Sequence, residues 1–84
     1  MERYHFHVQN DTSYMRDESG MLLPDRAAAD RQAREIAAGI LADELVQGQG
    51  AVHLLITIDH PDGAPLAIVS ATAMLKIGAA PPLQ

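Results

Sequence analysis

The chain has 84 residues, 48% of them hydrophobic, with one phenylalanine, two tyrosines and no tryptophan, and its formal net charge is −5. A chain of this length holds a single core, and the shortage of large side chains makes that core thin. We therefore expect a homodimer or another protein partner to add buried surface. The acidic charge, with no cluster of Lys and Arg, disfavours binding to the phosphates of DNA or RNA.

The absence of cysteine excludes disulfides and thiolate metal ligands and is typical of a reducing compartment. The first residues contain no apolar signal segment, and no apolar run approaches the roughly 20 residues that a membrane helix needs. We therefore expect a cytoplasmic protein that is not inserted in a membrane.

Residues 3–9 alternate between apolar and polar side chains, which is the pattern of a strand with one buried face. The two expected faces are Tyr4, Phe6 and Val8 on one side and Arg3, His5, His7 and Gln9 on the other. Residues 10–12 have turn chemistry, so residues 13–16 are expected to return as a second strand and complete a hairpin. Residues 17–20 break the pattern, and residues 21–23 lead the chain to the next element.

A helix is predicted from residue 26 to about residue 47. Asp25 is a suitable N-cap, because its carboxylate can accept N–H bonds from the first turn and complements the positive end of the helix dipole. Apolar residues then recur at spacings of three and four, which indicates one face packed on a core. Gly48 and Gly50 are expected to end the helix.

Two further strands follow the helix and form a second hairpin. Residues 51–59 are rich in β-branched side chains and alternate in polarity. Residues 60–63 contain the Pro and Gly of a turn, and residues 66–75 follow as the last strand. The side chains expected on the helix side of the first of these strands are Val52, Leu54, Ile56 and Ile58. We expect the domain to cover residues 1–77 and residues 78–84 to form a flexible tail.

These elements predict an α+β fold of the order β-β-α-β-β. Its four-stranded antiparallel sheet carries one long helix packed on one face. If the two hairpins join through their long strands, the strands lie in the spatial order 2-1-3-4, counted along the chain.

Three segments resemble a family of short bacterial domains of unknown function, and the resemblance covers almost the whole chain. The segments are Arg3-Tyr4-x-Phe6-His7-Val8 in the opening strand, Arg16-Asp17-x-x-Gly20 in an acidic turn, and Leu23-Pro24-Asp25 at the helix start. The resemblance implies the fold but no activity, catalytic residue or cofactor, since none is established for that family. A looser likeness to small antitoxin domains that neutralise mRNA-cleaving toxins implies, as a further alternative, a protein-binding role.

The histidines are the candidate site residues. His5 and His7 project from one face of the first strand, and His53 is expected on the corresponding face of the third, so three imidazoles could converge as ligands for zinc, copper or nickel. Histidines on a strand are more often solvated or part of an interface. Together with Leu55 and Val69 they mark a sheet face that no second helix covers, and that face is our candidate interface.

The acidic residues of the two turns are expected to be solvated; they are Asp17, Glu18, Asp59 and Asp62. No nucleophile has the setting of a catalytic site, so we predict no catalytic residue and lean toward a protein without enzyme activity. The sequence favours an interaction or regulatory module that self-associates through the open sheet face or its edge strands. The main alternative is a metal-binding or hydrolytic protein that uses the three histidines.

Overall fold

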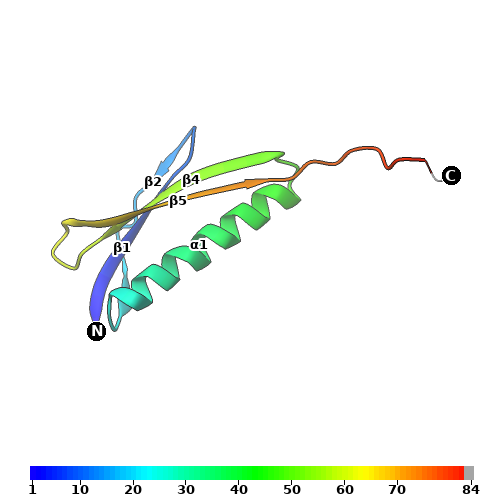
Figure 1. Ribbon diagram of the computed structural model, residues 1–84. Helices are drawn as coiled ribbons and strands as arrows, with labels where there is room; N and C mark the ends of the chain where they lie inside the picture. Colours follow the sequence, from blue (N-terminus) through cyan, green and yellow to red (C-terminus); the bar gives the residue numbers. More distant parts are fainter. Residues whose placement is uncertain (83–84) are drawn as a thin grey trace.

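The computed structural model describes residues 1–82, which form one helix and a five-stranded antiparallel sheet (Figure 1). In chain order the elements are β1 (Glu2–Gln9), β2 (Tyr14–Met15), β3 (Met21–Leu23), α1 (Arg26–Val46), β4 (Ala51–Asp59) and β5 (Pro65–Met74). Helix α1 lies along one face of the sheet, as Figure 1 shows. The predicted α+β class and the single helix on an antiparallel sheet are therefore confirmed.

The sheet contains one strand more than predicted. The path β2-β1-β4-β5 has the predicted order, but β3 also pairs with β1, on the same edge as β2. Strand β3 pairs with the start of β1, and β2 pairs with its last two residues, Val8 and Gln9. The number and order of the strands thus differ from the prediction only by the addition of β3. Three residues are too few to show an alternation, so only their position beside β1 makes them a strand.

Helix α1 approaches the sheet closely because small residues face it. Asp25 caps the helix as predicted, since its side chain accepts the N–H of Ala28 at 2.9 Å. Three alanines at four-residue spacing, Ala29, Ala33 and Ala37, are buried against the sheet. Below them lie the largest fully buried side chains of the described residues, which are Leu54, Ile56 and Ile58 of β4. The core is thin, and β4 is its centre.

The register of β5 places Val69 on the opposite face from the one predicted. Ile56 is the partner of Val69, and residues opposite each other in an antiparallel pair point to the same face. Val69 therefore packs against the core under α1, and the prediction that it belongs to the open face was wrong. The cause is that residues 66–69 are apolar at every position, so alternation could not assign their faces. Ile68 and Ser70 occupy the open face instead.

Beyond β5, residues 75–82 are in neither helix nor strand, and in Figure 1 this segment points away from the sheet and the helix. Leu75 is still held at its start, because its N–H donates to the carbonyl of Gly50 at 2.9 Å. The flexible tail predicted at residues 78–84 stays a prediction, and its last two residues lie outside the described residues. Among residues 1–82, no helix combines the length and the apolar character needed to cross a membrane.

Candidate functional site

The three candidate histidines do not converge. The rings of His5 and His7 are stacked with their centroids 6.3 Å apart. His7 is opposite Thr57, and His53 lies four residues earlier in β4, about 14 Å away at roughly 3.4 Å per residue. His53 instead lies exposed beside Ser70, with its Nε2 3.5 Å from the hydroxyl oxygen. Within residues 1–82 no group of three or more His, Cys, Asp and Glu is arranged to hold a metal ion, so the metal-binding alternative loses its geometric basis.

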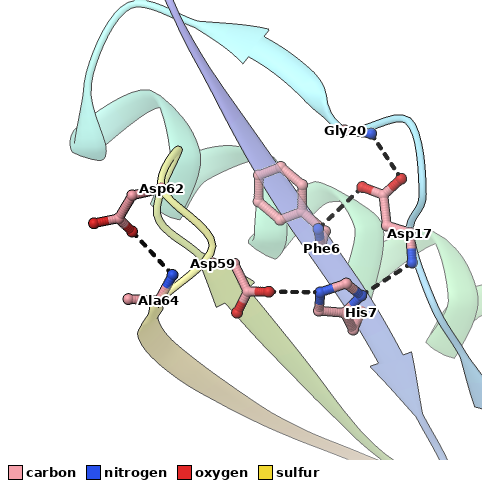
Figure 2. Close-up of polar contacts among 7 residues, drawn as sticks. All are labelled: Phe6, His7, Asp17, Gly20, Asp59, Asp62 and Ala64. Carbon is pink, nitrogen blue, oxygen red and sulfur yellow. Dashed lines mark hydrogen bonds and ion pairs between the residues drawn. The ribbon is translucent and has the colours of Figure 1, made fainter.

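His7 is buried rather than solvated or at an interface, with only 8% of its surface exposed. Its Nε2 lies 2.7 Å from the carboxylate of Asp59, and its Nδ1 accepts the backbone N–H of Asp17 at 3.0 Å (Figure 2). Because Nδ1 accepts a hydrogen bond, the ring proton is on Nε2, which donates to Asp59. Both nitrogens are therefore engaged within the fold, and neither is free to ligate a metal or to act as a general base.

The residues that cover His7 come from the segment between β1 and α1. Tyr14 of β2 stacks on its ring with a centroid distance of 6.2 Å, and Asp17 follows two residues after β2. The prediction treated the outer face of β1 as open because it did not place Tyr14 and Asp17 over that face. The structure corrects this part of the candidate interface, while Leu55 and His53 do lie on the uncovered face.

Asp17 connects β1 to the loop between β2 and β3. Its carboxylate accepts the N–H of Phe6 and the N–H of Gly20, each at 3.0 Å, as Figure 2 shows. Phe6 lies in the stretch of β1 between the residues that pair with β2 and those that pair with β3. The side chain of Asp17 thus takes the place of a strand partner at the gap between the two short strands.

The electrostatics of Asp17 fit this role. Burial is the largest single influence on its carboxyl and raises the pKa, whereas the hydrogen bonds from Gly20 and Phe6 lower it. The nearby His5 and the N–H of Ser19 lower it further, so the pKa of Asp17 lies below its ordinary value. We call the linked residues His7, Asp17 and Asp59 the His7 network; Asp59 bonds to the His7 ring through its carboxylate and Asp17 through its backbone N–H. Sequence analysis missed it, because it read both acids as solvated.

A polar hollow of about 390 Å³ opens beside the His7 network. Its lining consists of His5, His7, Arg16, Asp17, Glu18, Asp59 and Gly63. Charges of both signs lie in it, and its most buried histidine is already bonded to the carboxylate of Asp59 and to the backbone N–H of Asp17. Asp62, the last of the predicted turn acids, is exposed and caps its own turn by accepting the N–H of Ala64 at 2.9 Å (Figure 2). These bonded residues are better suited to stabilising the fold than to catalysis.

The outer edge of β5 is a part of the described sheet that is available to bind another chain. Among the described residues this strand has a partner on its β4 side only. Its ten residues, from Pro65 to Met74, contain no charged side chain. Ile68 is 68% exposed near its middle, and Met74 is exposed at its end. Sequence analysis named the edge strands as candidates without choosing between them.

Comparisons with known proteins identify a family for this chain but no function. No curated protein and no solved structure matches the chain. One family, described as a domain of unknown function, DUF6894, matches residues 3–72, which run from the start of β1 nearly to the end of β5. The resemblance to a family of unknown function is thereby confirmed at the level of the family. Since the match extends over most of the fold, the chain belongs to the family of domains of unknown function DUF6894.

Proposed function

We propose that this domain is a non-enzymatic interaction module that self-associates by pairing the open edge of β5 with β5 of a second copy. The observation that carries the proposal is the ten-residue uncharged edge of β5. A strand at a sheet edge presents a row of free N–H and C=O groups, which another strand can bind.

Natural sheets protect their edges with charges, prolines, bulges or very short strands. Strand β5 has a proline only at its first position, Pro65, and its one irregularity lies there too, between Ile58 and Asp59 of β4. From Leu66 to Met74 none of the usual protections is present. A free edge of this kind favours pairing with another chain.

Pairing would also bury apolar surface that the monomer leaves open. Val69 and Ala71 of β5 point toward α1 but are only half-buried, because the helix covers β4 more fully than β5. Two β5 strands related by a twofold axis would lie antiparallel and place identical faces on the same side. Both helices would then cover one face of a continuous sheet, and each would lie near the half-buried residues of the joined edges.

The histidine geometry supports the non-enzymatic part of the proposal. His7 is the most buried titratable side chain of the polar hollow, and its two ring nitrogens are already bonded to Asp59 and Asp17. A general base needs a free nitrogen within reach of a substrate proton. His7 does not offer one unless the network opens.

The test is sedimentation of the full chain over a range of concentrations, with the variant Ile68→Lys and the matched control Val46→Lys. Both positions are exposed, Val46 to 85%, but Val46 is at the end of α1 and away from the edge. We expect the unmodified chain and Val46→Lys to dimerise and Ile68→Lys to dimerise much more weakly, because a charged side chain on an edge strand opposes pairing through β5. A monomeric unmodified chain at millimolar concentration would refute the proposal.

A further inference from the structure

A second place on the sheet has an unpaired strand edge. Strand β1 ends at Gln9, which is opposite Leu55, so residues 51–54 of β4 extend past it. These four residues pair with β5 on one side and with no strand of the described chain on the other. After β1 the chain turns at residues 10–13 and returns as β2, which pairs with β1 and not with β4. The sheet therefore has a notch at this corner.

The notch is hollow and has an apolar interior. It forms an open cavity of about 230 Å³ between the turn after β1, the start of β4 and the end of α1. Val8, Ile40, Val52 and Leu54 supply its apolar lining, and three of them are only half-buried. Since a cavity of about 150 Å³ accommodates a benzene ring, this one has room for one or two aliphatic side chains. Asp11 and Glu44 make its rim acidic.

The chain itself carries a segment that fits this notch. Residues 75–78 alternate, so that in an extended conformation Leu75 and Ile77 point to one side and Lys76 to the other. Ile77 is 89% exposed and Leu75 is half exposed, although both are large and apolar. Lys76 is the only charged residue between 75 and 82, and its charge is opposite to that of the notch rim.

The segment is placed to reach another molecule rather than its own notch. Leu75 is bonded to Gly50, so the segment leaves the domain on the β5 side of β4. The notch opens on the β1 side of β4. In Figure 1 the segment continues away from both the sheet and the helix.

We propose that residues 75–78 of a second copy bind in the notch as a short strand added beside residues 51–54. Ile77 and Leu75 enter the cavity toward Ile40, and Lys76 lies toward Asp11 on the rim. Main-chain hydrogen bonds to the free edge of β4 add to the apolar contact. This contact is separate from the β5 edge and goes beyond the function proposed above, since it joins copies through another part of the molecule.

The test uses full-length chains that carry Ile68→Lys, so that pairing through β5 is removed and any remaining association comes from elsewhere. Sedimentation then measures the dimerisation constant of Ile68→Lys alone, with Ile77→Asp added, and with the matched control Val46→Asp added. We expect Ile77→Asp to weaken association about tenfold or more, because it replaces a buried aliphatic side chain with a charge. Val46→Asp is expected to leave it unchanged. Should Ile68→Lys fail to fold, Ser70→Lys provides the same background.

A charge exchange tests the contact at the rim. On the Ile68→Lys background, Lys76→Glu is expected to weaken association, and Lys76→Glu with Asp11→Lys is expected to restore it. The proposal is overturned if Ile68→Lys is monomeric at every concentration or if Ile77→Asp and Val46→Asp act alike. It is also overturned if Ile77→Asp changes the amide resonances of residues 51–54 by the same amount at all concentrations, because the chain's own segment would then fill the notch. Failure of β5 pairing gives a different result, in which the unmodified chain and Ile68→Lys associate equally.

Discussion

The two edges of the sheet differ in how they are covered. On the β1 side, two short strands and the carboxylate of Asp17 cover the edge, and the same segment buries His7. On the β5 side, ten uncharged residues have no strand beyond them in the described chain. The β1 edge is thus closed by long-range polar contacts, and the β5 edge is left available. The covered edge thus serves stability, whereas the open edge is the one through which we propose association.

Removal of the Asp17 side chain should have the largest effect on stability. Asp17→Ala leaves the N–H groups of Phe6 and Gly20 without their acceptor. Each lost hydrogen bond to a charged group is worth about 1.5–3 kcal/mol, so we expect the free energy of unfolding to fall by about 3 kcal/mol. Urea unfolding followed by circular dichroism measures this. Asp17→Asn, which keeps an acceptor oxygen, is the control and should lose less. Equal stability of Asp17→Ala and the unmodified chain would contradict the role given to this side chain.

A glycine beside Asp17 should give the next largest effect. Gly20 has φ +70°, and an added Cβ would lie 2.8 Å from the carbonyl oxygen of Tyr4. Gly63 has φ +93°, but an added Cβ there would meet nothing within 4 Å. Gly63→Ala therefore measures the backbone strain alone, about 1 kcal/mol, and Gly20→Ala should cost about 1–2 kcal/mol more. Comparison of the two unfolding midpoints isolates the close contact with β1, and similar midpoints would show that the loop can shift away.

The parts of this fold that sequence analysis predicted are those with a regular period. The alternation of Tyr4 and Phe6 and the four-residue spacing of the alanines depend only on neighbours in the chain, so strand, helix and buried faces followed from them. Val69 could not be placed, because residues 66–69 are apolar at every position. The partner of His7 is Asp59, which is 52 residues away, so their contact depends on the register of β1 and β4. That register cannot be predicted from the pattern of residues near either side chain in the sequence.

Acid should weaken the closed edge through Asp17. Because the pKa of its carboxyl is lower in the folded chain than in the unfolded one, the ionised form stabilises the fold. This contribution is fully present above the ordinary aspartate pKa, about 3.9, and is lost as the pH falls through the lower folded value. We expect the difference in stability between the unmodified chain and Asp17→Asn to be constant between pH 5 and 7 and to shrink below about pH 4. A difference that grows in acid would reverse the assigned sign.

The smallest effect on stability is expected at the open edge, and it separates the two edges most directly. Ser70 is exposed on the outer face of β5, and its hydroxyl lies beside the exposed His53. If the β5 edge serves association alone, Ser70→Lys should change the unfolding free energy of the monomer by no more than about 0.5 kcal/mol, as for other surface substitutions. The same change should prevent pairing through β5 and so weaken dimerisation. Unfolding at concentrations below the dimerisation constant, combined with sedimentation above it, measures both quantities on one variant. A loss of stability as large as that of Asp17→Ala would show that the β5 edge, like the β1 edge, holds the monomer together.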